Sequence, residues 1–332
     1  MTISVAINGL GRIGRTILRQ IASRGVDSPF RITRLNDIAG LDMIAYLLRF
    51  DSVFGLFPGD IGIRQDQLVL NGVRIPFSDS ARLEIDLSDT DILLDCTGKA
   101  RTRSFVEFGI KAGAQQTLIS GPSPAADVTI VLGANEHTLG DARVVSNASC
   151  TTNALAPLLK SLDELWGLET AHMTTIHCYT GSQPMIDAPR ADMARSRAGG
   201  LSMVPTTTSA HRLIDHVLPH LAGRVSAAAL RVPTASVSAV DIVAQFRCLP
   251  DGDLTPQIKA LAENASVMGW TADPNVSSDL RARPESVVLA LPETQRVRKN
   301  QLRVFGWYDN EWGFSARMLD MAQIMTSRPQ MT

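Results

Sequence analysis

No stretch of the 332-residue sequence approaches the run of about 20 apolar residues that a bilayer-spanning helix needs. An excess of one charge is also missing, since 32 Lys and Arg residues face 33 Asp and Glu residues and the formal net charge is −1. Surfaces that bind nucleic acid or anionic lipid through charge need a strong basic excess. We therefore expect no nucleic acid and no membrane among the partners of this protein.

Features of exported proteins are scarce as well. The N-terminus, MTISVAINGLGRIGR, lacks the basic region, the apolar stretch and the small-residue cleavage site of a signal peptide. The cysteines are widely spaced, without a C-x-x-C pair, which disfavours a disulfide framework or a zinc site. They are Cys96, Cys150, Cys178 and Cys248. The sequence thus predicts a cytoplasmic protein with reduced thiols, any of which is open to a chemical role.

The length of the chain predicts two domains, and its first half has a pattern of its own. Strand-like runs at residues 3–8, 30–35, 91–95, 117–119 and 128–132 alternate with helical spacing at residues 12–24, 43–50 and 105–112. The run at 91–95 has the continuous apolar centre of a strand that is buried on both faces. This alternation predicts an α/β architecture with a doubly wound parallel sheet.

Beyond residue 150 the pattern changes. Helical spacing occurs at residues 154–165 and 315–328, and long strand-like segments lie at residues 170–177, 227–232, 236–246 and 301–308. An irregular stretch rich in Pro, Arg and Gly occupies residues 179–201. Long strands joined in this way predict an α+β domain built on a largely antiparallel sheet.

A glycine-rich motif, Gly9-Leu10-Gly11-Arg12-Ile13-Gly14, follows the first strand and begins the first helix. In such a motif Gly9 permits a tight turn, Gly11 lets the backbone approach a pyrophosphate, and Gly14 lets helix and strand pack closely. The helix N-terminus offers free N–H groups and a positive dipole to the phosphates. Alone the pattern is weak, but its position between a strand and a helix predicts a Rossmann-type dinucleotide site.

An acidic residue at the end of the second strand strengthens this interpretation. Asp37 can accept hydrogen bonds from the adenosine ribose hydroxyls, and its charge would repel a ribose 2′-phosphate. NAD is therefore favoured over NADP. The alternative is that Asp37 only caps the turn before Ala39 and Gly40. In this context we favour the cofactor role.

A hydroxyl-rich segment surrounds Cys150 in the sequence SNASCTTN, where strand gives way to helix. A helix N-terminus stabilises a thiolate, so we expect a lowered thiol pKa. Ser149, Thr151 and the local N–H groups offer donors to an oxyanion or a phosphate. A buried structural cysteine is the ordinary alternative, and we favour it for the other three thiols because they lie in apolar or strand-like runs.

A reactive cysteine needs a basic partner, and phosphate needs hydroxyl, N–H and guanidinium donors. His177 is the candidate base, although sequence alone pairs none of the six His residues with Cys150. Candidate phosphate ligands are Thr180, Arg195, Arg197, Thr206, Thr207, Thr208, Ser209 and Arg231. On composition alone, a solvated or capping role is the better explanation for each of these.

Taken together, these motifs resemble the glyceraldehyde-3-phosphate dehydrogenase family over nearly the whole chain. INGLGRIGR is similar to its N-terminal fingerprint, and SNASCTTN at residues 146–153 to its nucleophile signature. The segments MTTIHCYTGSQ, RSRA, VPTTT, LRVPTASVSAVD and WYDNEWG follow in the family's order and spacing. The resemblance implies a homotetramer with a Rossmann NAD-binding domain at 1–149 and 315–332 and a catalytic domain at 150–314. It also implies a role in glycolysis.

The resemblance also implies roles for individual residues. Cys150 corresponds to the nucleophile and His177 to the base that activates it. Thr180 and Arg231 correspond to the site of the substrate's own phosphate. The site of attacking inorganic phosphate corresponds to Ser149, Thr151, Arg195, Thr208 and Ser209. The NAD contacts correspond to Gly9, Gly11, Arg12, Ile13, Asp37, Thr97, Gly98, Ser120 and Asn310, of which Asn310 would hold the nicotinamide carboxamide. No metal is implied.

The implied reaction oxidises a small phosphorylated aldehyde, glyceraldehyde 3-phosphate, through a Cys150 thioester that inorganic phosphate converts to an acyl phosphate. An alternative resembles erythrose-4-phosphate dehydrogenase, in which water resolves the thioester. Others are a specialised paralogue with another phosphorylated aldehyde, and a binding protein that has lost its chemistry. The presence of both Cys150 and His177 speaks against the last. Departures from the family pattern include Ser182, Ala194, Ser209 and Phe314, and they bear on substrate and acceptor, not on the nucleophile.

Overall fold

The computed structural model describes residues 2–81 and 85–327, and they form two compact units. The first comprises residues 1–130, 137–148 and 314–332, as far as they are described, and the second comprises residues 131–136 and 149–313. The sequence predicts domain boundaries at 149/150 and 314/315, which would place residues 131–136 in the first domain. They cluster with the second unit, where Gly133 lies close to Pro157 and Val267.

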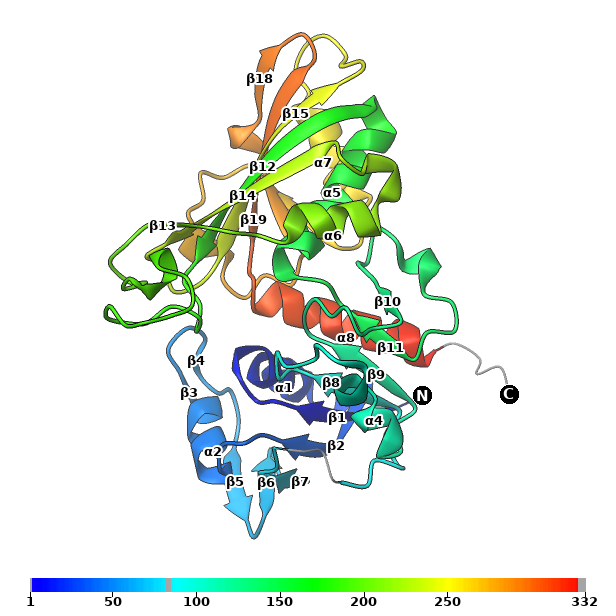
Figure 1. The fold of residues 1–332 in the computed structure, drawn as a ribbon, viewed down its shortest axis with the longest axis vertical. Helices are drawn as coiled ribbons and strands as arrows, with labels where there is room; N and C mark the ends of the chain where they lie inside the picture. The colour runs from blue at the N-terminus through cyan, green and yellow to red at the C-terminus, as the bar shows by residue number, and fades with distance from the viewer. Residues whose placement is uncertain (1, 82–84, 328–332) are drawn as a thin grey trace. The chain divides into compact units, whose positions relative to one another are not determined.

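The first unit is built on a sheet with the strand order β10-β11-β9-β8-β1-β2-β7-β6-β5 (Figure 1). Its strands are β1 (Ile3–Asn8), β2 (Phe30–Asn36), β5 (Ile61–Arg64), β6 (Gln67–Leu70), β7 (Val73–Ser78), β8 (Ile92–Asp95), β9 (Gln116–Ile119), β10 (Val128–Thr129) and β11 (Val144–Ser146). Neighbouring strands from β10 through β2 to β7 are parallel, whereas β5, β6 and β7 pair antiparallel. The predicted doubly wound parallel sheet is thus confirmed, with an antiparallel extension that the sequence did not indicate.

The helices of this unit are α1 (Arg12–Ser23), α2 (Leu41–Arg49), α3 (Arg103–Val106), α4 (Phe108–Lys111) and most of α8 (Trp312–Thr326). A short hairpin joins β3 (Phe50–Asp51) to β4 (Gly55–Leu56). The predicted helix at residues 105–112 is in fact two short helices. Helix α8 is tied to the unit by Gln116, whose amide donates to the carbonyl of Met325 at 3.2 Å.

The second unit is built on a sheet of order β13-β14-β12-β15-β19-β17-β16, with β18 paired to β19. Its strands are β12 (Leu168–Cys178), β13 (Val204–Thr206), β14 (Val225–Val232), β15 (Ser238–Phe246), β16 (Met268–Thr271), β17 (Val287–Ala290), β18 (Gln295–Arg298) and β19 (Gln301–Tyr308). Two pairings are parallel, β12 with β14 and β16 with β17, and the others are antiparallel. This confirms the predicted, largely antiparallel α+β domain.

Three helices accompany this sheet, namely α5 (Cys150–Trp166), α6 (Ala210–Val217) and α7 (Thr255–Glu263). Helix α5 packs on β12 and β15 and contacts α6, as Figure 1 shows. It buries Leu155, Leu158, Leu159 and Leu162, all fully inaccessible to solvent. Burying each such side chain stabilises the fold by about 1.5–3 kcal/mol. The helix is therefore a firm support for its first residue, Cys150.

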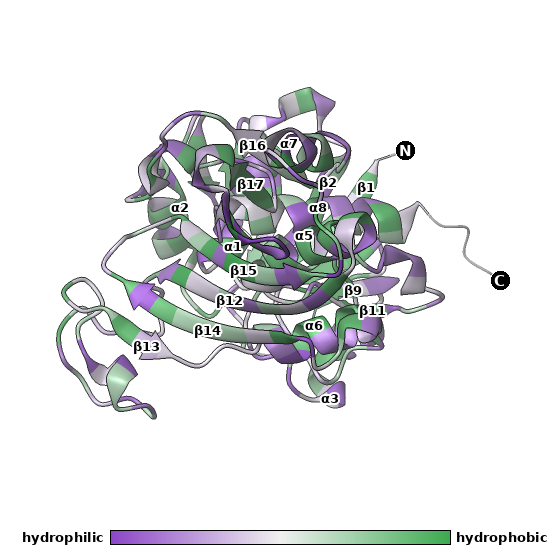
Figure 2. Ribbon diagram, turned by 90° about the horizontal axis from the view of Figure 1, so that it is seen from above, coloured by the Kyte–Doolittle hydropathy of each residue, from purple (hydrophilic) through white to green (hydrophobic). Residues whose placement is uncertain are grey.

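The register of the second sheet decides which side chains meet. Strands β12 and β14 are parallel with His177 opposite Arg231, and β15 and β19 are antiparallel with Ser238 opposite Tyr308. Figure 2 shows β14, β12 and β15 side by side. Because side chains alternate between the two faces of a strand, a slip of one residue would separate these partners.

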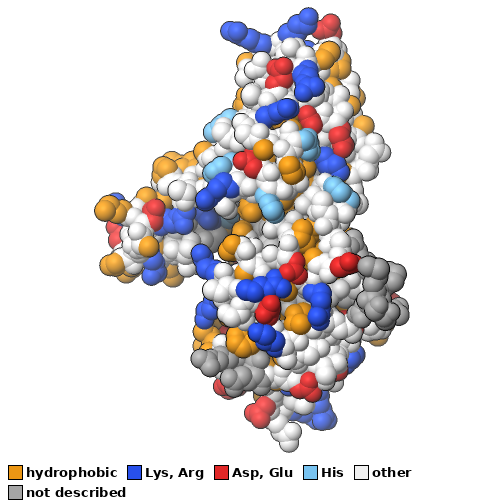
Figure 3. Space-filling view, turned by 45° about the vertical axis from the view of Figure 1, so that its right-hand side comes forward, with side chains coloured by type: hydrophobic (Ala, Val, Ile, Leu, Met, Phe, Trp, Pro, Cys, Tyr) orange, Lys and Arg blue, Asp and Glu red, His pale blue; other side chains and the backbone are white. Residues whose placement is uncertain are grey.

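Charged side chains of both signs are interspersed over the face drawn in Figure 3, as the balanced composition leads one to expect. None of the helices in the described ranges is long and apolar enough to cross a membrane.

Candidate active site

Cys150 is the first residue of α5. The helix is capped by Ser149, whose hydroxyl oxygen accepts from the N–H of Thr152 at 3.1 Å. The Ser149 carbonyl also accepts from the side chain of Asn153 at 3.0 Å. Ser149 is thus committed to holding the helix start, and it fixes the backbone from which the Cys150 thiol projects.

The partner of this thiol is His177, near the end of β12. Its Nε2 lies 3.7 Å from Cys150 Sγ. On its other side, Nδ1 lies 2.7 Å from the carbonyl oxygen of Cys178 and 2.8 Å from Nη1 of Arg231. When Nδ1 carries a proton it donates to the carbonyl, and when it does not it accepts from the guanidinium. The sulfur, the imidazole and the guanidinium therefore form one connected group.

The electrostatics of this group differ from the sequence-based expectation. Burial raises the pKa of the Cys150 thiol, although the Arg231 charge and the donors of Thr151 act in the opposite direction. Burial and then Arg231 lower the pKa of His177 to about 4. The predicted lowering of the thiol pKa was wrong in direction because desolvation outweighs the helix start. His177, whose Nε2 lies 3.7 Å from the sulfur, is therefore the group placed to accept the proton of this thiol.

A buried tyrosine lies behind the pair. The hydroxyl of Tyr308 hydrogen-bonds to Thr151 Oγ1 at 2.9 Å and to Thr175 Oγ1 at 2.8 Å. Its ring meets that of His177 edge to face, with centroids 6.0 Å apart. Burial raises the pKa of Tyr308 far above its ordinary value, so it remains a neutral hydroxyl. Tyr308 links α5 to β12 through the two threonines.

The candidate phosphate ligands divide into separate groups. Thr180 shares a hydrogen bond with Ser182, the two hydroxyls being 2.9 Å apart. Arg195 donates to the Thr206 hydroxyl at 2.5 Å and to the Thr207 hydroxyl at 3.0 Å.

Two further candidates follow Thr207 directly. The Thr208 hydroxyl accepts from the N–H of Ala210 at 3.1 Å, and Ser209 is the N-cap residue of α6. Arg197 instead pairs with Asp187 at 2.7 Å. In the part of the chain that the structure describes, no hydrogen bond joins Thr180, Arg195, Thr208 or Ser209 to the pair of Cys150 and His177.

The first unit contains a pocket at the carboxyl ends of its strands, with a cavity of about 440 Å³. It is lined by Asn8, Gly9, Gly11, Asn36, Asp37, Ile38, Ser80, Ala81, Asp95, Cys96, Thr97, Lys99, Phe105 and Phe108. This is where open parallel sheets bind their ligands. The pocket is formed by residues of this unit alone.

The glycines of the motif fit a phosphate-binding turn. Gly9 has φ +91°, and a Cβ there would lie 2.8 Å from the carbonyl carbon of Cys96. A Cβ at Gly14 would lie 2.0 Å from the carbonyl oxygen of Gly9. Gly11, in contrast, faces open space within 4 Å. The turn is therefore tight on the protein side and accessible on the pocket side, which suits a dinucleotide.

Asp37 has a structural function in addition to its place in the pocket. Its carboxylate accepts from the N–H of Leu10 at 2.5 Å and from the N–H of Ala39 at 2.8 Å. Each carboxylate oxygen has two lone pairs, so acceptor capacity remains for ribose hydroxyls. The capping role and the cofactor role that were weighed against each other are compatible.

A polar network at the base of the pocket was not recognised from the sequence. Asn36 donates to the Asn8 side chain at 2.8 Å, and Asn8 donates to Asp95 at 3.0 Å. Asp95 in turn accepts from the Thr97 hydroxyl at 2.8 Å. Burial raises the pKa of Asp95, opposed by these donors. The sequence signal that could have revealed this network is the position of its residues, because Asn8, Asn36 and Asp95 each end a parallel strand.

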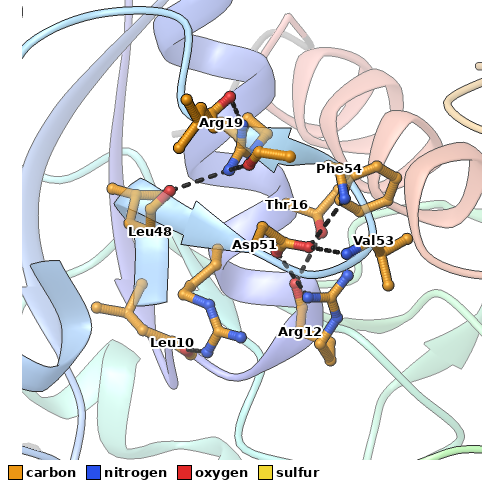
Figure 4. A network of polar contacts seen from close by, with 11 residues as sticks. Leu10, Arg12, Thr16, Arg19, Leu48, Asp51, Val53 and Phe54 are labelled. Atoms are coloured by element: carbon orange, nitrogen blue, oxygen red, sulfur yellow. Dashed lines mark hydrogen bonds and ion pairs between the residues drawn. The ribbon is translucent and has the colours of Figure 1, made fainter. Parts of the chain in front are cut away.

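Arg12, a predicted NAD contact, is engaged elsewhere in the structure (Figure 4). Its guanidinium pairs with Asp51 at 2.6 Å and lies over the ring of Phe54. Asp51 also accepts from the N–H groups of Val53 and Phe54. Next to it, Arg19 donates to carbonyls of the segment that includes the hairpin β3–β4. The start of α1 is thus anchored to this hairpin.

Two family models match the chain. One, described as the NAD binding domain of glyceraldehyde 3-phosphate dehydrogenase, matches residues 3–103, and the other, described as its C-terminal domain, matches residues 149–310. The chain is 42% identical to a glyceraldehyde-3-phosphate dehydrogenase of Cereibacter sphaeroides, over 98% of this chain and 99% of that protein. It is 41% identical to one of Xanthobacter flavus and 36% identical to glyceraldehyde-3-phosphate dehydrogenase 2 of Bacillus subtilis, again over 98% or more of each chain. The chain belongs to the glyceraldehyde-3-phosphate dehydrogenase family.

Membership of this family makes the protein an NAD-dependent dehydrogenase, and it confirms the resemblance inferred from the motifs. In the structure of this family member, the predicted cofactor residues that line the pocket are Gly9, Gly11, Asp37 and Thr97. As far as the structure describes it, the lining of this pocket does not include Arg12, Ile13, Gly98 or Ser120. Asn310 belongs to the second unit.

The cysteines outside the candidate site were all expected to be buried. Cys178 is buried, whereas Cys96 is only partly buried; the desolvation of each thiol raises its pKa to about 12, so both are unreactive. Cys248 is exposed, and the expectation was wrong for this residue. It lies two residues beyond Phe246, the last residue of β15, so the apolar pattern of that strand does not predict its burial.

Proposed function

We propose that this protein oxidises glyceraldehyde 3-phosphate with NAD and inorganic phosphate to give an acyl phosphate. The observation that supports this most directly is the group formed by Cys150, His177 and Arg231. It combines a nucleophile, a base 3.7 Å away and a guanidinium beside that base. Such a guanidinium suits a phosphorylated substrate. The names of the relatives point to the same aldehyde.

In the proposed reaction His177 takes the thiol proton of Cys150, and the sulfur then forms a bond to the aldehyde carbon. The imidazolium returns its proton to the carbonyl oxygen, which gives a thiohemiacetal. His177 next removes the hydroxyl proton while the carbon loses a hydride, which leaves a thioester. NAD, when bound, accepts that hydride. The imidazole suits the role of base because burial and Arg231 lower its pKa to about 4, so that it is neutral at neutral pH and can take up a proton.

The cofactor site proposed for NAD is the pocket of the first unit. Gly9, Gly11 and the start of α1 would hold the pyrophosphate, and Asp37 the adenosine ribose. We keep Arg12, Ile13, Thr97, Gly98, Ser120 and Asn310 as proposed contacts. Of these, Asn310 would hold the nicotinamide carboxamide.

Phosphate is the proposed acceptor of the acyl group, and its attack on the thioester releases the Cys150 thiolate. Arg195, held beside Thr206 and Thr207, precedes the hydroxyls of Thr208 and Ser209. We propose that these groups and Thr151 bind the attacking anion, while Thr180 and Arg231 bind the phosphate of the substrate. A site that used only water would not need such a set of donors.

The test is NADH formation from a panel of phosphorylated aldehydes, with and without inorganic phosphate. We expect the highest kcat/KM with glyceraldehyde 3-phosphate, a steady rate that rises with phosphate, and an acyl phosphate as product. A steady rate indifferent to phosphate, with free acid as product, would assign the protein to the hydrolytic class. A preference for erythrose 4-phosphate or another aldehyde would overturn the proposed substrate.

Arg195→Ala separates the two half-reactions. The variant should raise the phosphate concentration needed for half-maximal turnover but leave the first-turnover burst of NADH nearly unchanged, because hydride transfer precedes phosphate attack. A burst that falls as much as the steady rate would contradict the proposed role of Arg195.

We also propose a homotetramer in the cytoplasm, which rests on the resemblance and the sequence. Large apolar side chains are exposed on and beside the irregular segment 179–201, namely Met185, Ile186, Met193, Leu201 and Met203. Subunit contacts would cover such side chains. Light scattering coupled to size-exclusion chromatography measures the assembly directly.

A further inference from the structure

The side chain of Asn310 is held at its oxygen by two donors. Oδ1 accepts from the Cys178 thiol, with Sγ at 3.1 Å, and from the Ser238 hydroxyl, also at 3.1 Å. The Ser238 oxygen itself accepts from the backbone N–H of Cys178 at 3.2 Å. That last bond takes up a lone pair of the hydroxyl and directs its hydrogen toward Asn310. All three residues are buried.

The two donors come from neighbouring strands whose positions are fixed. Cys178 ends β12 and Ser238 begins β15, and these strands are paired antiparallel. Ser238 also lies opposite Tyr308 on β19, two residues before Asn310. The register of the central sheet therefore fixes the two donors, and Asn310 lies in the turn that follows β19.

Cys178 can serve as a lasting donor because it does not ionise. Burial raises its pKa to about 12, so the thiol keeps its hydrogen over the pH range in which a dehydrogenase works. Cys150 and Cys178, which both neighbour His177, thus have different proposed roles. One is a nucleophile with a base beside it, and the other is a fixed hydrogen-bond donor.

An amide has two different ends, and only one of them is engaged. Within the described residues, Oδ1 of Asn310 has two partners, whereas Nδ2 makes no hydrogen bond. An amide oxygen with two donors cannot turn away without leaving both unpaired in a buried place, which is costly. The N–H groups of Nδ2 are therefore the end offered to a ligand, and they require an acceptor.

We propose that the Cys178 thiol and the Ser238 hydroxyl are positioning residues that orient the Asn310 amide as a hydrogen-bond donor to the carbonyl oxygen of the nicotinamide carboxamide. This rests on the proposed role of Asn310 in NAD binding. It adds the direction of the hydrogen bond and the two side chains that set it.

The probe that reads this direction is 3-acetylpyridine adenine dinucleotide. It keeps the carbonyl oxygen of the carboxamide but has a methyl group where NAD has the amide nitrogen. If Asn310 donates through Nδ2, it can bind the carbonyl oxygen that both coenzymes have. If Asn310 accepts through Oδ1, it can bind only NAD, because the analogue has no amide N–H. The measurement is the Kd of each coenzyme by calorimetry, without aldehyde or phosphate, and the quantity compared is the Kd ratio of analogue to NAD.

We expect a ratio near one for the unmodified protein. In the double variant Cys178→Ala, Ser238→Ala the amide is free to turn. One orientation donates to both coenzymes and the other accepts only from NAD, so the ratio should rise about twofold. Cys178→Ser in the Ser238→Ala background keeps a donor and should restore the low ratio. Asn310→Ala should raise the Kd of both coenzymes by the same factor. Because both are measured on the same preparation, partial loss of folded protein cancels in the ratio.

The proposal fails if the unmodified protein binds NAD far more tightly than the analogue, since Asn310 would then present its oxygen. It also fails if the double variant leaves the ratio unchanged or if Cys178→Ser does not restore it. These outcomes are independent of the proposed substrate. A protein that oxidises no phosphorylated aldehyde but shows the expected ratios would overturn the proposed reaction and support the positioning roles.

Discussion

At the scale of single residues, the proposed chemistry depends on the pair of Cys150 and His177. Cys150 is partly buried and His177 is buried, which opposes their charged forms, and the charge of Arg231 lowers the pKa of both. It favours the thiolate and disfavours the imidazolium. The reactivity of the thiol is therefore a property of the three residues together and not of the cysteine alone.

Alkylation tests this dependence. Iodoacetamide near neutral pH should modify Cys150 and abolish turnover, and His177→Asn should slow that modification about tenfold or more because the proton acceptor is gone. Cys248 is exposed and will also react, so peptide mass spectrometry must follow each thiol separately. Cys248→Ser is the matched control, and iodoacetamide should inactivate it at the same rate as the protein without substitutions. Activity loss that follows Cys248 would contradict the assignment of the nucleophile.

The pH dependence of stability tests the environment of His177. In a Cys150→Ala background the folded pKa of His177 is expected near 4, against about 6.5 in the unfolded chain. The unfolded chain then binds more protons between these values, so the free energy of unfolding falls as pH falls from about 6.5 toward 4. The measurement is urea unfolding over this range, with His177→Asn in the same background as the reference.

Arg231→Gln supplies the second half of that test. Removal of the cation should raise the pKa of His177 and so reduce the acid-dependent loss of stability. Arg195→Gln is the matched control, because Arg195 donates to Thr206 and Thr207 and not to the imidazole. Equal effects of the two substitutions would show that Arg231 does not act on His177 directly.

At the scale of elements, the start of α5 positions the proposed nucleophile, Cys150. Ser149→Ala should cost about 1 kcal/mol in the free energy of unfolding because a helix N–H loses its acceptor. It should also lower kcat, since the cap fixes the backbone of Cys150. Ser149→Asn keeps a capping oxygen and should restore most of the stability, as measured by urea unfolding. Full activity in Ser149→Ala would show that the cap has no part in positioning the thiol.

The sequence predicted many elements well and their pairing poorly. The strand at 3–8 and the helix at 12–24 followed from periodicity and the glycine motif, and the structure has them at Ile3–Asn8 and Arg12–Ser23. The meander β5–β7 and the helices α6 and α7 were not recognised, because short or partly exposed elements have weak patterns. The pairing of His177 with Arg231 was beyond the sequence as well. It depends on a strand register that no local pattern encodes.

At the scale of the whole molecule, binding of the cofactor should raise the free energy of unfolding. NAD bound to the folded protein and not to the unfolded chain should stabilise it by about 2.7 kcal/mol at a hundredfold excess over Kd. The melting temperature should therefore rise by several degrees with NAD and by much less with NADP at the same concentration. Differential scanning fluorimetry measures both. An equal rise with the two nucleotides would contradict the preference assigned to Asp37.

The two bonds that Asp37 makes to the backbone bear on any attempt to redesign the coenzyme preference. The carboxylate holds the N–H groups of Leu10 and Ala39, and we propose that its charge also excludes a 2′-phosphate. A change to Gly would remove the repulsion and also loosen the turn that NADP itself needs. Asp37→Asn removes the charge and keeps one acceptor oxygen. Coenzyme engineering in this protein therefore has to supply a second acceptor for the glycine-rich turn before it adds a cation for the phosphate.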